Sequence, residues 1–173
     1  MKELIIIDGY NFIFDYYRKD IKAKDISSKD LPYLRERLIK DLIEYRSYRN
    51  CDLTVVFDAK HSNNIKRNDT VINKVRIIYS SKGETADSVI EEMIKSVPMY
   101  NRIFVVTSDY MQQKVIFRDN IFRKSIREFV IEISNLKGEI EEKIKSNKNI
   151  SERSFYNLEK RLNCKSKENL SKL

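Results

Sequence analysis

Four aspartates occupy positions in the sequence where a carboxylate could do chemistry. Asp8, Asp58 and Asp109 each follow a hydrophobic segment directly, and Asp87 falls in the first turn of a predicted helix. In a parallel α/β sheet the carboxyl ends of the strands share one edge, and ligands bind outside it. The sequence therefore predicts that these acids meet at one edge of a sheet, although they lie far apart along the chain.

Each of these acids also has an ordinary explanation. Asp109 could cap the helix that follows it, and Asp87 could favour the positive end of its helix dipole. Asp8 and Asp58 could be turn residues. Together, however, neighbouring carboxylates repel and raise one another's pKa unless a cation lies between them. Because the cluster offers oxygen ligands without histidine or cysteine, it predicts Mg2+ or Mn2+ as the cofactor and disfavours zinc.

The overall charge of the chain indicates the partner. The chain has 34 Lys and Arg residues against 26 Asp and Glu residues, a net charge of +8. Basic proteins favour polyanions, although lysine-rich surfaces also occur on proteins that bind no nucleic acid. An acidic metal pocket in a basic protein fits phosphodiester hydrolysis, in which Lys and Arg hold the backbone and the metal activates water.

The segments that must position these acids alternate between strand and helix patterns. Branched aliphatic and aromatic runs predict strands at residues 4–7, 52–58, 74–79 and 102–107. Gly9 is expected to allow a tight turn that exposes the Asp8 carboxylate. Strands alternating with helices predict an α/β fold, a three-layer α/β/α sandwich with a mostly parallel central sheet.

Apolar spacings of three and four predict a helix from residue 31 to about residue 49, with Asp30 as its cap. Further helices are predicted after residue 85, over residues 109–117, and from residue 125 onward. The polar segment 61–69 is predicted to be an exposed loop and segment 118–124 a basic connection.

Composition also limits the location of the protein. No apolar run approaches the length of a membrane span, and the N-terminus has no signal-peptide pattern. Cys51 and Cys164 are isolated and lack metal-type spacing. A cytoplasmic protein with reduced thiols, no disulfide partner and no membrane contact is therefore expected.

Four ordered motifs resemble a known family. IIIDGYN at residues 5–11, VVFDA at 55–59, ETADSVIE at 84–91 and VTSDYMQQ at 106–113 are similar to those of the NYN-domain ribonucleases, which have a PIN-like fold. The resemblance covers about residues 3–135 and points to the YacP-type branch, which includes a ribosome-associated endoribonuclease that cuts messenger RNA.

The resemblance implies a metal-dependent endoribonuclease that acts on RNA, with mRNA as the substrate and the ribosome as a partner. It implies that Asp8, Asp58, Asp87 and Asp109 form the catalytic metal site, with Asn11 and Ser108 beside it. It also implies a PIN-like NYN nuclease domain over residues 1–136, followed by a Lys/Glu-rich helical extension over residues 137–173.

A basic strip after the fourth motif is predicted to hold the RNA backbone. Its members are Arg118, Arg123, Lys124 and Arg127. The alternative for these residues is a solvated charged face. The chain departs from the branch here, because segment 117–125 lacks the glycine and small residues usual in that branch. The departure bears on the local RNA contacts more than on the metal site.

Two side chains beside the acids have open roles. Glu84 could add a carboxylate to the metal site or help to cap the following helix. Tyr10 could stack on a base or simply pack beside the end of its strand.

Other function classes fit the sequence less well. A receiver domain requires adjacent acids after the first strand, but Gly9 follows Asp8. An Asp-x-Asp phosphatase is disfavoured because Tyr10 occupies the position of the second acid. Dinucleotide binding is disfavoured because the chain has only three glycines and no glycine-rich phosphate loop. A non-catalytic RNA- or ribosome-binding module with the same fold remains the alternative to an enzyme.

Overall fold

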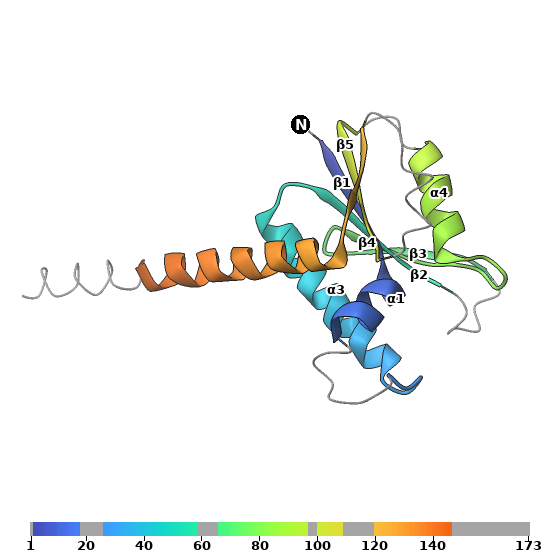
Figure 1. The fold of residues 1–173 in the computed structure, drawn as a ribbon, viewed down its shortest axis with the longest axis horizontal. Coiled ribbons are helices and arrows are strands. Elements are labelled where there is room, and N and C mark those ends of the chain that lie inside the picture. The colour runs from blue at the N-terminus through green and yellow to red at the C-terminus, as the bar shows by residue number, and fades with distance from the viewer. Residues whose placement is uncertain (1, 18–25, 59–65, 97–99, 109–119, 147–173) are drawn as a thin grey trace, which may run out of the picture. The chain divides into compact units, whose positions relative to one another are not determined.

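The computed structural model of the chain describes residues 2–17, 26–58, 66–96, 100–108 and 120–146 (Figure 1). The chain divides into two compact units, residues 1–133 and residues 134–173. In the second unit, residues 134–146 are helical. The division by function that we predicted, a nuclease domain over residues 1–136 and an extension over 137–173, stays a prediction.

The first unit is built on a six-stranded sheet with the order β3-β4-β2-β1-β5-β6. Its strands are β1 (Glu3–Asp8), β2 (Asp52–Phe57), β3 (Asn68–Ile72), β4 (Val75–Tyr79), β5 (Arg102–Val106) and β6 (Ile121–Lys124). All neighbouring strands pair in parallel except β3, which runs antiparallel to β4. The predicted α/β fold with a mostly parallel sheet is confirmed.

The central strands are those that the apolar runs predicted. In β1 the side chains of Ile6 and Ile7 point to opposite faces, and both are fully buried. A strand that is buried on both faces requires helices on both sides of the sheet, and this arrangement is found here.

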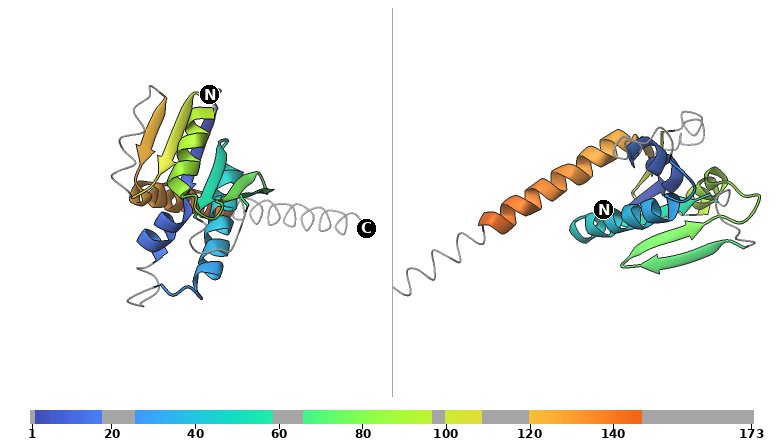
Figure 2. Two further views of the ribbon diagram at one scale, coloured as in Figure 1. Left: turned by 90° about the vertical axis from the view of Figure 1, so that its right-hand side faces the viewer. Right: turned by 90° about the horizontal axis from the view of Figure 1, so that it is seen from below.

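Helices cover the two faces as separate layers (Figure 2). One face carries α1 (Gly9–Phe12), the π-helix η1 (Ile13–Tyr17) and α3 (Leu31–Tyr48). Phe129, in the helical segment 126–133, contacts this layer edge-on through Phe12 and Tyr45, with ring centroids 6.3 and 5.0 Å apart. The other face carries α4 (Ala86–Ser96), whose apolar side packs against Leu4, Ile6 and Val56.

Two edge strands were not predicted. Segment 61–69 was expected to be a loop, but β3 begins at Asn68, and the basic connection 118–124 contains β6. Every residue of β3 is exposed, and two of the four residues of β6 are exposed. Edge strands exposed in this way lack the apolar pattern that identifies a buried strand. The β3–β4 turn, with φ of 47° at Asn73 and 69° at Lys74, is typical of a tight hairpin.

The start of helix α3 differs from the prediction in the contacts of one side chain, that of Asp30. Helix α3 begins and ends within one residue of the prediction, and its buried side is formed by leucines at the predicted spacing. Asp30 is the N-cap residue of this helix, as predicted, but its side chain makes no capping hydrogen bond. The Asp30 backbone is already helical, so its carboxylate accepts hydrogen bonds from the backbone N and Oγ of Ser27 instead. The helix predicted over residues 109–117 lies outside the described residues.

Within the part of the chain that the structure describes, we find no helix with the length and apolar character needed to cross a membrane.

Candidate active site

Asp8 is held rigidly at the end of the central strand. It is the last residue of β1 and the N-cap of α1, with Oδ1 accepting a hydrogen bond from the Asn11 backbone N at 3.1 Å. Its Oδ2 accepts a second bond from Asn11 Nδ2 at 2.8 Å. Only 5% of the residue is exposed. The capping interaction therefore sets the orientation of a carboxylate that is largely shielded from water.

Gly9 has a different role from the one expected. Among the glycines in the described segments, only Gly83 has a positive φ, so Gly9 makes no left-handed turn. A Cβ at Gly9 would lie 2.4 Å from Cε1 of Phe57, well inside contact distance. The glycine is thus required because α1 begins directly against the ring at the end of β2.

Two further carboxylates act on Asp8. Burial, chiefly, raises the pKa of Asp8 to about 6, hydrogen bonds from Asn11 oppose the rise, and the charges of Asp87 and Asp58 add to it. Asp58 directly follows β2, the parallel neighbour of β1, and Asp87 lies in the first turn of α4. The structure thus brings three of the four predicted acids close enough to interact. Asp109 lies outside the described residues.

The position of Asp87 is set by the start of α4. Thr85 Oγ1 accepts a hydrogen bond from the Ser88 backbone N at 3.2 Å, and Ser88 Oγ accepts one from the Thr85 backbone N at 3.2 Å. This reciprocal arrangement is a capping box. It fixes the first helical turn and thereby the backbone that carries Asp87.

Glu84 stabilises the loop before α4. Its carboxylate accepts hydrogen bonds from Ser81 N and Oγ at 3.0 and 3.1 Å and forms an ion pair with Arg67. Hydrogen bonding from Arg67, chiefly, lowers the pKa of Glu84 to about 2. Since these partners already compensate its charge, Glu84 is a structural residue of this loop rather than a member of the acid cluster.

Asn11 connects Asp8 to the end of β5. Its Nδ2 lies 3.5 Å from Thr107 Oγ1, and Ser108 Oγ donates a hydrogen bond to its Oδ1 at 3.3 Å. The predicted placement of Asn11 and Ser108 beside the acids agrees with this geometry. Thr107 is fully buried and was not among the predicted site residues, although it lies inside the fourth motif.

The donor set of this edge suits a hard cation. Asp8, Asp58 and Asp87 offer only carboxylate oxygens, and the charges of Asp87 and Asp58 add to the rise in the pKa of Asp8 that burial chiefly causes. Within the described segments, no group of three His, Cys, Asp or Glu side chains is arranged to hold a metal by itself. Asp109, the fourth predicted ligand, lies outside the described residues, and the metal site stays a prediction.

The predicted basic strip divides into parts with different surroundings. Arg123 Nη2 lies 3.5 Å from the Thr107 carbonyl oxygen, next to the acidic edge. Arg127 is exposed, and Arg118 lies outside the described residues. Lys124 forms an ion pair with Glu132 at 2.6 Å and is 19% exposed, so we do not include it among the RNA contacts.

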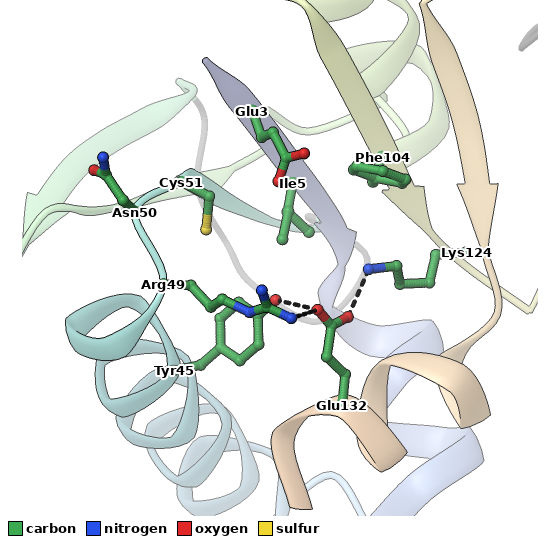
Figure 3. A pocket seen from close by; sticks show the side chains of 9 residues that line it. All are labelled: Glu3, Ile5, Tyr45, Arg49, Asn50, Cys51, Phe104, Lys124 and Glu132. Atoms are coloured by element: carbon green, nitrogen blue, oxygen red, sulfur yellow. Dashed lines mark hydrogen bonds and ion pairs between the residues drawn. The ribbon is translucent and has the colours of Figure 1, made fainter. Parts of the chain in front are cut away.

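Lys124 and Glu132 line a separate cavity of about 290 Å³ on the face covered by α3 (Figure 3). Glu132 also accepts hydrogen bonds from Tyr45 Oη at 3.0 Å and Arg49 Nη2 at 2.8 Å. Burial would raise the pKa of Glu132, but Lys124, Tyr45 and Arg49 together hold it below its usual value. The nearby Cys51 has its thiol pKa raised to about 11 by burial, so the thiolate is disfavoured here.

Comparison with known proteins finds one family over nearly the whole chain. The model of the YacP-like NYN domain matches residues 5–173. The uncharacterized protein YacP of Bacillus subtilis (strain 168) is 31% identical over 144 residues, which cover 83% of this chain and 82% of the relative.

Two crystal structures of Rae1 (YacP) from Bacillus subtilis have a similar fold. One, a mutant, superposes with a TM-score of 0.68 at 32% identity, covering 83% of this chain and 82% of that one. The other has a TM-score of 0.68 at 28% identity, with 92% and 89% covered.

Proposed function

The chain belongs to the YacP-like NYN domain family, and from this premise we propose that it is a metal-dependent endoribonuclease that hydrolyses RNA phosphodiester bonds. The observation that carries the proposal is the acid cluster of Asp8, Asp58 and Asp87 at the carboxyl edge of the sheet, in a chain with a net charge of +8. Such a cluster is stabilised by a divalent cation, and a basic surface attracts a polyanion.

The ligands of the proposed metal are Asp8, Asp58, Asp87 and Asp109. Bound Mg2+ or Mn2+ would supply an activated water and neutralise charge on the phosphate oxygens. Asn11 keeps the Asp8 carboxylate oriented through its two hydrogen bonds. Ser108, held against Asn11, stands where a hydroxyl could contact the substrate at the same edge.

Arg123 and Arg127 are the proposed contacts to the RNA backbone among the described residues, and Arg118 is a further proposed contact. Arg123 supports this role most directly, because its guanidinium lies against the end of β5 beside the acids. Phosphate contacts of this kind position the RNA without reading its sequence.

We further propose that the substrate is mRNA, that cleavage occurs in association with the ribosome, and that the protein acts in the cytoplasm. The support for these finer statements is the similarity of the four motifs to the YacP-type branch. The basic charge of the chain agrees with a ribonucleoprotein partner.

The test is incubation of the purified chain with translated and untranslated RNA in Mg2+, Mn2+ or EDTA, with mapping of the ends produced. We expect internal cleavage in either metal and none in EDTA. Asp8→Asn is expected to be inactive, whereas the matched variant Asp15→Asn, at an exposed position of η1, is expected to cleave normally. Full activity of Asp8→Asn, or activity in excess EDTA, would overturn the proposal.

The second candidate is a non-catalytic RNA- or ribosome-binding module. It is favoured by the observation that the described residues contain no complete group of metal ligands. Tight RNA binding that is unaffected by metal, without cleavage of any transcript, would support this candidate against the nuclease.

A further inference from the structure

A second cluster adjoins the same sheet edge, where β2 and β4 end. We call it the Arg35 cluster, and its members are Tyr10, Arg35, Phe57 and Tyr79. Phe57 and Tyr79 are paired in register at the ends of β2 and β4, and Asp58 follows Phe57 directly. Arg35 reaches this edge from α3. The cluster therefore adjoins the acids, because Tyr10 lies in α1, which Asp8 caps, and Phe57 ends the strand that Asp58 follows.

Uncharged aromatic groups hold the guanidinium of Arg35. Its Nη1 donates a hydrogen bond to Tyr10 Oη at 3.1 Å, and its Cζ lies 5.7 Å from the ring centroid of Tyr79. The Tyr79 ring stacks on Phe57, with centroids 5.3 Å apart and planes inclined by 20°. Tyr10 and Tyr79 thus hold the cation through contacts that carry no negative charge.

Arg35 differs in this respect from other arginines of the same unit. Arg67 pairs with Glu84 and Glu92, Arg76 with Asp69, and Arg49 with Glu132. Within the described segments, no carboxylate forms an ion pair with Arg35. The guanidinium has five N–H donors in a planar fork that matches the oxygens of a phosphate.

Arg35 is close to the acids without being neutralised by them. Its hydrogen-bond acceptor Tyr10 lies two residues after Asp8. The Tyr79 ring that its guanidinium contacts stacks on Phe57, the residue directly before Asp58. A ligand with a phosphate at Arg35 would therefore have its neighbouring groups beside Asp58. Single-stranded RNA has successive phosphates, so one phosphate can bind Arg35 while a neighbouring one lies at the acidic edge.

We propose that Arg35 binds a backbone phosphate of single-stranded RNA, within a few nucleotides of the phosphate that is cleaved. The inference rests on the proposed function and extends it to a substrate subsite. Arg123 lies on the opposite side of the acids, on β6. From β4 to β6 the sheet spans four strand spacings, about 19 Å, so the RNA crosses the carboxyl edge over a few nucleotides.

The first test measures binding of a single-stranded RNA in EDTA, where no cleavage occurs. We expect Arg35→Gln to bind about 10-fold more weakly, the loss of one charged hydrogen-bonding contact. We also expect the slope of log K against log salt to decrease by about 0.7, as for one phosphate contact on a single strand. Lys40→Gln removes one charge from the exposed side of the same helix and is expected to keep the wild-type salt slope.

The second test separates direct contact from a structural effect. A series of RNAs, each with one neutral methylphosphonate, is bound to the wild type and to Arg35→Gln. If Arg35 contacts a phosphate, one position weakens wild-type binding and has no further effect in Arg35→Gln, because the two changes remove the same interaction. Arg35→Lys keeps the charge but not the planar fork, so we expect partial recovery. An unchanged melting temperature excludes loss of folding as the cause.

The outcomes distinguish this inference from the proposed function. Additive losses at every methylphosphonate position, or a wild-type salt slope in Arg35→Gln, would overturn the phosphate contact even if the protein cleaves RNA. RNA binding with the expected coupling but without cleavage would support the contact and overturn the nuclease. No RNA binding by the wild type would overturn both.

Discussion

Asp8 and Glu132 are two carboxylates of the same unit, and their surroundings shift their pKa values in opposite directions. Glu132 is surrounded by Lys124, Arg49 and Tyr45, which lower its pKa. Asp8 is more buried, and this burial raises its pKa to about 6, with further contributions from the charges of Asp87 and Asp58. Glu132 thus links β6 to α3 with compensated charge, whereas Asp8 is buried beside two like charges at the acidic edge. A buried carboxylate with a strongly raised pKa, such as Asp8, is a candidate for a functional site.

The largest expected difference is in catalysis. Asp8→Asn should reduce RNA cleavage by roughly 100-fold or more, because it removes a metal ligand, and even the supporting partners of ligands are worth 10- to 100-fold. Glu132→Gln should leave the cleavage rate of the folded protein within about 3-fold, because its contacts lie in the separate cavity. Initial rates of cleavage of one labelled RNA in Mg2+ measure both. Equal losses in the two variants would contradict the distinction.

The next largest effect is on stability, and here Glu132→Gln is the variant with the larger loss. Glu132→Gln should lower the free energy of unfolding by about 2–3 kcal/mol, because Lys124 and Arg49 lose their common partner in a partly buried site. Urea denaturation at pH 7 measures the change. Glu91→Gln, which loses only the exposed pair with Lys95, is the control and should change stability by less than about 0.5 kcal/mol.

Gly9→Ala tests how the acidic edge is positioned. The added methyl would lie 2.4 Å from the Phe57 ring and should destabilise the protein by about 1–3 kcal/mol while displacing α1 and its cap, Asp8. A thermal melt and a cleavage assay measure the two consequences. The double variant with Phe57→Leu should regain part of the activity, since the smaller side chain makes room. Absence of any such rescue would show that Gly9 acts in some other way.

The smallest expected effect is a gain in the stability of the metal-free protein when Asp8 is replaced by Asn. Burial raises the pKa of Asp8 from its ordinary value of 3.8 to about 6 in the folded chain, so folding favours its protonated form. This contribution is fully present below pH 3.8 and is lost as the pH rises through 6. Above that pH, burial of the ionised group destabilises the fold, by at most about 3 kcal/mol.

Asp8→Asn removes this penalty but also weakens the bond from Asn11 Nδ2, so we expect a net gain of about 1 kcal/mol at pH 7.5 in EDTA. The gain should vanish at pH 4. Mg2+ should stabilise the wild type and not the variant. Chemical denaturation at the two pH values, with and without Mg2+, measures these differences. A destabilised variant at pH 7.5 in EDTA would contradict the conclusion that burial of the ionised Asp8 carboxylate lowers stability.

Much of the fold followed from local patterns. The run of aliphatic residues before Asp8 and the leucines of α3 predicted the correct elements, because a doubly buried strand and an amphipathic helix each leave a periodic signal. The edge strands β3 and β6 leave no such signal, since most of their side chains are exposed and need not be apolar. Asp30 is the predicted N-cap residue, but its carboxylate accepts hydrogen bonds from Ser27 rather than from the helix.

By itself, the amino-acid sequence determined the acids that end the strands, the basic charge and the family motifs. Topology then explains why Asp8, Asp58 and Asp87 meet, since parallel strands end at one edge. Only the tertiary structure decided that Lys124 pairs with Glu132, that Gly9 makes room for Phe57, and that Arg35 joins the acidic edge. These contacts depend on side-chain packing between elements distant in sequence, and no local periodicity encodes them.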